Sequence, residues 1–142
     1  MKLSFVVCAL AVLVSACGGG SNGSPTAPSA NVPFSTVDVR VGTGTEATAG
    51  RTASVNYALY HYSATAADNK GSLLQSGPLP PFVVGGNGVI PGFSQATLGM
   101  KVGGLRRAVV PPNLAYGSNP PSGSGIGVNE TLVFEIELLG VQ

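Results

Sequence analysis

The chain has 142 residues, with 7 Lys and Arg against 6 Asp and Glu, so its formal net charge is +1. This length suits a single domain, and the near-neutral charge leaves no basic surface for nucleic acid. One His and two Cys exclude a His/Cys zinc cage and a disulfide framework, although composition leaves a carboxylate site for a hard cation open.

The N-terminal residues carry much of the chain's apolar character. The mean hydropathy is +0.33, and Met1 and Lys2 precede an apolar stretch from Phe5 to Val14. This stretch has the length of a signal-peptide core and is too short to span a bilayer permanently. Residues 1–16 are therefore predicted to be an export signal.

The end of this segment is more specific. The sequence Val14-Ser15-Ala16-Cys17 resembles the lipobox of bacterial lipoproteins, in which the cysteine receives lipid before the signal peptide is removed. The resemblance implies a palmitate-type anchor on Cys17, with each buried CH₂ contributing roughly 0.8 kcal/mol to membrane binding. Gly18 replaces the Asp that commonly retains lipoproteins at the inner membrane, so we expect the outer membrane, facing the periplasm. The alternative is an ordinary signal peptide followed by an incidental cysteine.

A tether and a globular part follow. Residues 17–34 carry no charge and little apolar bulk, which predicts a flexible segment with an r.m.s. span of roughly 20–25 Å. Residues 35–142 form the predicted domain. Alternating apolar residues predict strands over Val37–Val41, Ala53–Leu59 and Leu132–Leu138.

The remaining predicted elements complete the fold class. Two further strands are expected around Phe82–Val84 and Leu105–Val110, and one helix over Ser94–Met100, with Ser94 as its N-cap and Gly99 or Gly103 near its end. These elements predict an α+β domain, in which an antiparallel sheet of about five strands curls around one short helix.

Most conventional catalytic groups are missing. His61 lies between two tyrosines in a predicted strand and is interpreted as a surface residue. Residues 85–88 (GGNG) lack the Lys-Ser/Thr of a phosphate-binding loop and are interpreted as a plain turn. The carboxylates are scattered along the chain, with no close pair: Asp38, Glu46, Asp68, Glu130, Glu135 and Glu137. An enzyme of this composition would need chemistry without an acid, a base or a nucleophile.

Five sequence blocks point to such an enzyme. They are residues 86–93 (GNGVIPGF), 98–104 (LGMKVGG), 106–107 (RR), 111–117 (PPNLAYG) and 130–139 (ETLVFEIELL). In this order and spacing they resemble the FKBP family of macrolide-binding peptidyl-prolyl cis-trans isomerases. The resemblance runs from about Val41 to the C-terminus.

The resemblance implies a pocket between the helix and the sheet, without a cofactor. The implied catalytic residues are Tyr57, Phe93 and Tyr116. The implied substrate-binding residues are Leu74, Gln75, Val89, Ile90, Ile126 and Phe134. The hydroxyl of Tyr116 and the main-chain N–H of Ile90 are implied donors to the substrate carbonyl. On composition alone, several of these apolar residues could equally be simple core, and Phe82 is assigned to the core.

The chain also departs from the family pattern. Phe93 stands where the strongest ligand binders carry Trp, and Leu74-Gln75-Ser76 replaces the usual Phe-Asp-Ser. Pro80 replaces another common pocket aromatic, and Gly127-Val128 replaces the usual Pro-Pro. With smaller aromatic walls, we expect macrolides to bind weakly.

The sequence thus predicts a monomeric, lipid-anchored isomerase that acts on proline-containing polypeptides of the bacterial envelope. A second interpretation is a peptide-binding or chaperone module derived from such an isomerase, with weak or no catalysis. A third, an inert structural lipoprotein, leaves the pocket residues unexplained.

Overall fold

The computed structural model of the protein describes residues 32–142. The predicted signal peptide, the lipid site at Cys17 and most of the tether lie outside the described residues. Within the described part, no helix is long and apolar enough to cross a membrane.

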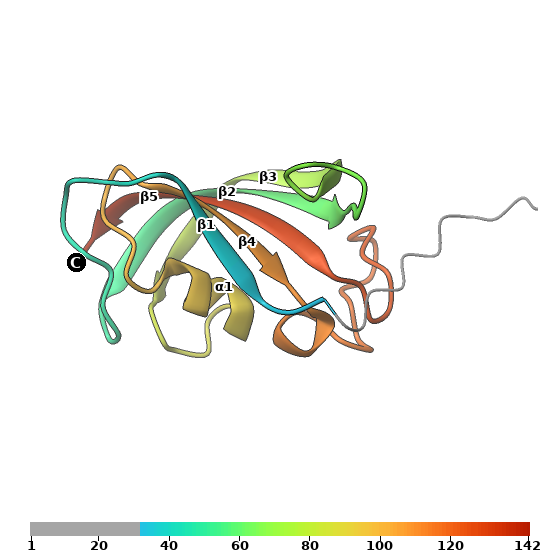
Figure 1. Ribbon diagram of the computed structural model, residues 1–142. Coiled ribbons are helices and arrows are strands. Elements are labelled where there is room, and N and C mark those ends of the chain that lie inside the picture. Colours follow the sequence, from blue (N-terminus) through green and yellow to red (C-terminus); the bar gives the residue numbers. More distant parts are fainter. Residues whose placement is uncertain (1–31) are drawn as a thin grey trace, which may run out of the picture.

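The domain is an antiparallel sheet curved around one helix (Figure 1). Its strands are β1 (Ser35–Arg40), β2 (Thr52–Tyr62), β3 (Lys70–Val83), β4 (Leu105–Val110) and β5 (Leu132–Val141). The helix α1 (Pro91–Thr97) packs against the sheet, and a 3₁₀ turn, η1 (Pro112–Leu114), follows β4. The strand order is β1-β4-β5-β2-β3. The predicted fold class is confirmed.

The core lies between α1 and the inner face of the sheet. In β5 the alternating residues Leu132, Phe134, Ile136 and Leu138 are all buried, as the sequence predicted. In β2, Leu59 pairs with Phe134 and contributes to the same face. Alternation places every second side chain on the covered face of a strand, so β2 and β5 present an apolar face to the helix.

Helix α1 both begins and ends three residues earlier than the predicted Ser94–Met100. Pro91 occupies its first turn, where a missing N–H is harmless, and Ile90 is the residue before the helix. Ser94 is therefore not an N-cap: it lies inside the helix, and its hydroxyl accepts the N–H of Gly85 at 2.7 Å. Gly99 follows the helix end with φ +77°, a conformation that glycine adopts without steric penalty.

Two contacts fix α1 on the sheet. Gly92 is buried against β4, and a Cβ atom at this position would lie 2.3 Å from Cγ1 of Val110. At the other end of the helix, Arg106 of β4 donates from Nη1 to the carbonyls of Ala96 and Leu98, both at 3.0 Å. The same guanidinium binds Asp38 of β1, with Nε 2.6 Å from Oδ1. A cation at the carbonyl end of a helix is favourable, and here it also ties the helix to two strands.

Strand β3 is much longer than the predicted Phe82–Val84 segment. It is an edge strand of 14 residues, and it contains three prolines, Pro78, Pro80 and Pro81. The register against β2 shifts across Pro80 and Pro81, because proline cannot donate a hydrogen bond to the ladder.

The opposite edge, β1, lies exposed along its whole length. Val37 and Val39 are 57% and 49% exposed. Their alternation predicted a strand, and the strand is present, but nothing in the described part of the chain covers these valines.

Candidate functional site

A cavity of about 250 Å³ opens between α1, the inner face of the sheet and the chain after η1. Its lining is mainly apolar. The lining residues are Tyr57, Leu59, Gln75, Leu79, Gly88, Val89, Ile90, Phe93, Tyr116, Pro121, Ser124, Ile126 and Phe134.

Phe93 forms the floor of the cavity, and other aromatic rings hold it edge to face. Its centroid lies 6.1 Å from that of Tyr57 at 90°, and 5.3 Å from that of Phe134 at 82°. Phe82 packs on it from the core, at 5.6 Å. Perpendicular aromatic pairs at these distances are stabilising, so the ring of Phe93 is fixed before any ligand arrives.

The backbone before α1 forms one side of the cavity. Val89 and Ile90 both line it, and the carbonyl of Ile90 accepts the N–H groups of Phe93 and Ser94 at 3.1 and 3.2 Å. These bonds fix the main chain of Ile90 at the rim, because they are the first bonds of the helix.

Tyr116 supplies a polar group to the cavity. It follows η1 and is partly buried. Burial raises the pKa of its phenol, and the nearby Tyr57 raises it further. Burial disfavours the charged phenolate, so the hydroxyl stays protonated and can donate a hydrogen bond.

The cavity brings together the predicted site residues except Leu74. Gln75 reaches the lining from an exposed position in β3. Leu74 instead packs beside the loop after η1, where its Cδ2 would lie 3.0 Å from a Cβ on Gly125. Pro80 lines a neighbouring hollow of about 570 Å³, which shares Leu79 with the cavity.

Sequence reasoning missed five lining residues: Leu59, Leu79, Gly88, Pro121 and Ser124. Leu59 could have been found, since alternation places it on the same face of β2 as Tyr57. Leu79 lies in the irregular part of β3, and the other three lie in loops. In neither case does an alternation of apolar residues indicate which side chains face the cavity.

His61 lies in β2, as predicted, but it is only partly exposed and is paired with another side chain. Its Nδ1 pairs with Oε1 of Glu130, a residue 69 positions away. Glu130 is buried, and its other oxygen, Oε2, accepts the N–H of Gly127 at 2.5 Å. No sequence signal joins these residues, because the contact depends on how the loop after η1 returns to the sheet.

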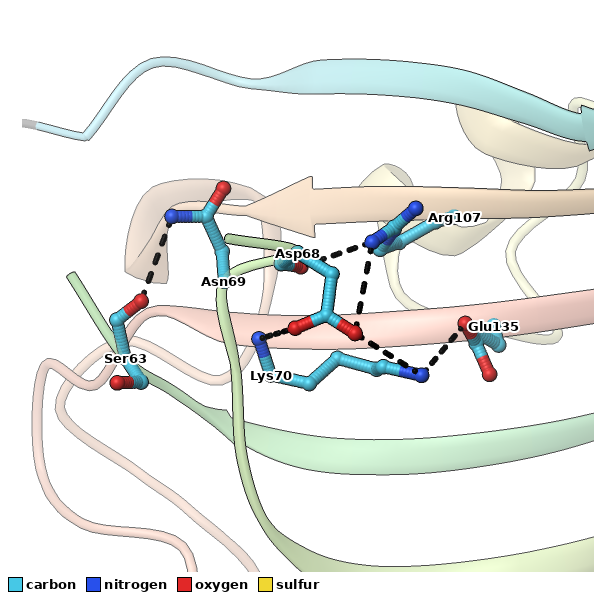
Figure 2. A network of polar contacts seen from close by, with 6 residues as sticks. All are labelled: Ser63, Asp68, Asn69, Lys70, Arg107 and Glu135. Atoms are coloured by element: carbon cyan, nitrogen blue, oxygen red, sulfur yellow. Dashed lines mark hydrogen bonds and ion pairs between the residues drawn. The ribbon is translucent and has the colours of Figure 1, made fainter. Parts of the chain in front are cut away.

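A second polar cluster lies outside the cavity, where the loop between β2 and β3 meets the sheet (Figure 2). Nζ of Lys70 lies 2.9 Å from Oε1 of Glu135 and 3.3 Å from Oδ2 of Asp68. The hydrogen bond to Glu135 is the main cause of the raised pKa of Lys70. The N–H of Lys70 donates to Asp68 and is the main cause of that carboxyl's lowered pKa. Arg107 adds a bond to the carbonyl of Asp68 at 3.2 Å.

This second cluster has a structural role. Each charge in it faces a charge of opposite sign, which holds the loop against β4 and β5.

Among residues 32–142, no group of three or more His, Cys, Asp or Glu side chains is placed to hold a metal ion. The cavity itself offers apolar walls, aromatic faces and a neutral donor, which suits a small apolar ring beside a carbonyl group.

Comparisons with known proteins agree with this geometry. Residues 44–139 match the family described as FKBP-type peptidyl-prolyl cis-trans isomerase. An FK506-binding protein of Streptomyces anulatus is 39% identical over 108 residues, which cover 73% of this chain and 82% of that protein. The 39 kDa FK506-binding nuclear protein of Drosophila melanogaster is 44% identical over 109 residues, which are 74% of this chain but 28% of that protein.

A solved structure shows the same arrangement. FkpA from Escherichia coli superposes with a TM-score of 0.60 at 34% identity, covering 77% of this chain and 48% of that chain. This chain therefore spans less than a third of the Drosophila relative and about half of FkpA.

Proposed function

Since the chain belongs to the FKBP-type peptidyl-prolyl cis-trans isomerase family, we propose that it catalyses rotation about X-Pro bonds in polypeptides. The cavity above Phe93 is the proposed active site. The observation that carries the proposal is the set of perpendicular aromatic rings around this cavity, next to the neutral hydroxyl donor of Tyr116.

The physical problem is the resonance of the amide. Rotation about the C–N bond has a barrier of about 18–20 kcal/mol, because the twisted amide loses its partial double bond. Uncatalysed X-Pro isomerisation consequently takes about tens to hundreds of seconds. A twisted amide is less dipolar than a planar one, so an apolar cavity disfavours the planar ground state more than the twisted state.

Each part of the cavity has a role in this mechanism. The proline ring rests on Phe93, between Tyr57 and Phe134, while Val89 and Ile126 exclude water. The Tyr116 hydroxyl and the Ile90 N–H donate to the substrate carbonyl as the amide twists. A tenfold gain in rate needs about 1.4 kcal/mol, so an acceleration of about 10⁴ needs about 5–6 kcal/mol. Desolvation with one or two neutral hydrogen bonds, each contributing about 0.5–1.5 kcal/mol, supplies energies of this order.

Macrolides are a secondary ligand class in this proposal. The names of the relatives from Streptomyces and Drosophila describe binding of FK506. In this chain Leu74 is not among the residues that line the cavity, Gln75 is exposed and Pro80 lines the adjoining hollow. These positions offer smaller walls than aromatic residues would, so the proposal includes weak macrolide binding.

The proposed place of action is the bacterial envelope, where the protein is held by lipid on Cys17 and acts on envelope polypeptides. The lipobox-like sequence from Val14 to Cys17 supports this part of the proposal. Expression of Cys17→Ser in a bacterium should leave an uncleaved precursor without lipid. A variant that still partitions into detergent at the mature mass would contradict the anchoring.

A matched pair of substitutions tests the active site. Phe93→Leu and Leu138→Val both replace a buried apolar side chain by a smaller one, and each should destabilise the fold by about 1–2 kcal/mol. Only Phe93 lines the cavity with the proposed substrate. Phe93→Leu should therefore lower kcat/KM for a Leu-Pro peptide by roughly tenfold, while folded Leu138→Val stays within about twofold of the parent.

The same assay distinguishes the second interpretation. If the unsubstituted chain binds the peptide without accelerating its isomerisation, the protein is a peptide-binding module. Equal activity of Phe93→Leu and the parent would remove the cavity from the mechanism.

A further inference from the structure

We propose that His61 and Glu130 are a positioning pair, which holds the loop of residues 118–129 over the cavity and thereby sets the affinity for the substrate polypeptide. This inference rests on the proposed function, since it concerns the same cavity. Within the described part of the chain, neither side chain lines the cavity, so both act through the loop.

Glu130 joins the loop to strand β2 through a single carboxylate. Its side chain is 6% exposed, with Oε1 paired to Nδ1 of His61 and Oε2 accepting the N–H of Gly127. A carboxylate taken out of water is tolerated only where its oxygens are paired or hydrogen-bonded. Loss of either partner therefore leaves buried charge uncompensated, and the loop must move to rehydrate it.

The tied loop forms one wall of the cavity. It contributes Pro121, Ser124 and Ile126 to the lining, and Ile126 directly precedes the Gly127 N–H that Glu130 holds. Inside the loop, the Ser124 hydroxyl donates to the carbonyl of Pro121 at 2.7 Å and accepts the N–H of Ile126 at 3.3 Å. These local bonds fix the conformation of the loop. The contacts of Glu130 with the Gly127 N–H and with His61 attach the loop to the sheet.

The composition of the loop explains the need for such a tie. Gly123 and Gly125 both adopt φ +76°, and glycine loses more conformational entropy on ordering than any other residue. Gly127-Val128 stands where the resemblance noted above places Pro-Pro, and proline would restrict the backbone without any partner. In this chain a side-chain contact supplies the restriction that two prolines would otherwise provide.

The position of His61 in β2 suits this contact. In β2 it pairs with Leu132 of β5, which brings its ring to the start of that strand, and its side chain remains 33% exposed. A protonated imidazole nitrogen donates to a carboxylate oxygen, so the contact ties the loop to strand β2.

The test uses the full-length chain with three substitutions and a matched control. Glu130→Gln removes the charge at constant shape, His61→Ala removes the partner, and His61→Asn restores an N–H donor near the position of Nδ1. The control is Glu137→Gln, the same change in β5, where the carboxylate pairs with Arg40 at 2.8 Å. Hydrogen exchange of residues 118–129 by mass spectrometry is measured together with KM and kcat for a Leu-Pro peptide.

The expected result is a coupled change in exchange and affinity. Glu130→Gln and His61→Ala should accelerate exchange in the loop and raise KM about three- to tenfold, with kcat changed less than about twofold. His61→Asn should recover most of both effects, and Glu137→Gln should show neither. A purely structural role would lower stability without this split between KM and kcat.

Three outcomes would overturn the inference. They are unchanged loop exchange, faster exchange with unchanged KM, and an equal effect of Glu137→Gln. If the unsubstituted chain proves inactive, the proposed function fails separately. The pair is then judged by the dissociation constant of the Leu-Pro peptide, which should rise by the same factor in Glu130→Gln and His61→Ala.

Discussion

Replacement of Gly92 by alanine sets two well-known effects against each other. Gly92 lies in the first turn of α1, where alanine would favour the helix by up to about 1 kcal/mol. The added methyl, however, would lie 2.3 Å from Cγ1 of Val110 and 3.0 Å from the carbonyl oxygen of Leu114. Carbon atoms pack best at about 3.5–4.0 Å, so the helix or strand β4 must move by about 1 Å.

The steric clash should outweigh the gain in helix propensity. Overpacking of a closed core costs about 1–3 kcal/mol, and neither obstacle can yield easily, because one is a fully buried β-branched side chain and the other is backbone. We expect Gly92→Ala to lower the free energy of unfolding by about 1–2 kcal/mol. Since α1 also carries Phe93, the shift should lower kcat/KM by roughly tenfold.

Urea unfolding and the isomerisation assay measure the two effects. Gly140→Ala is the control, because a Cβ there has no atom within 4 Å, and it should keep the activity of the parent and be no less stable. Val110→Ala should cost about 2 kcal/mol alone, but the double variant Gly92→Ala/Val110→Ala should be no less stable than Val110→Ala. If Gly92→Ala is as stable and active as the parent, the close approach of α1 to β4 does not hold, and this reasoning fails.

The remaining predictions concern the donor in the cavity and the polar cluster of Figure 2. Tyr116→Phe deletes only a hydroxyl, so loss of one neutral hydrogen bond should reduce kcat/KM by about two- to tenfold, and a collapse to zero in a folded variant would contradict that role. Because burial raises the pKa of Tyr116, kcat/KM should stay flat from about pH 7 to 9.5, and a decline near pH 8 would show that the phenol ionises early. Asp68 has a lowered pKa, so its carboxylate stabilises the fold above the unfolded pKa and loses this effect as pH falls. Asp68→Asn should therefore lower the melting temperature at pH 7, and this difference should shrink as the pH falls below the ordinary carboxyl pKa, whereas a difference that stays constant with pH would refute the ionic explanation.

The sequence predicted those elements in which burial of one face produces a regular alternation of apolar and polar residues. Strand β5 alternates cleanly because one face is covered by α1, and the blocks around Phe93 and Tyr116 carry the family resemblance. The helix boundary was wrong by three residues because Ser94 has the chemistry of a cap, while Pro91 was the true start signal. Local chemistry alone could not reveal that Ser94 binds Gly85 across the turn before the helix.

Strand β3 and the His61–Glu130 contact show what sequence patterns omit. The glycines and prolines of β3 are not typical of a strand, so the sequence did not predict its full length. Pairing with β2 nevertheless stabilises it as an edge strand, although the register is irregular. The contact of His61 with Glu130 joins residues 69 positions apart, and only the closed sheet brings them together. The burial of Glu130 could not be predicted from the sequence either, because glutamate is usually exposed.

The prolines of β3 have a consequence for a protein that handles extended chains. An unpaired sheet edge is a template on which another polypeptide can add as a strand, and β3 is the edge that contributes Gln75 and Leu79 to the cavity. Pro78, Pro80 and Pro81 leave residues 78–81 of this edge strand with one backbone N–H donor, that of Leu79, and the register against β2 shifts across Pro80 and Pro81. A polypeptide at the proposed site would therefore meet side chains along residues 78–81 but no continuous row of backbone donors there, which disfavours its capture as an added strand on this segment.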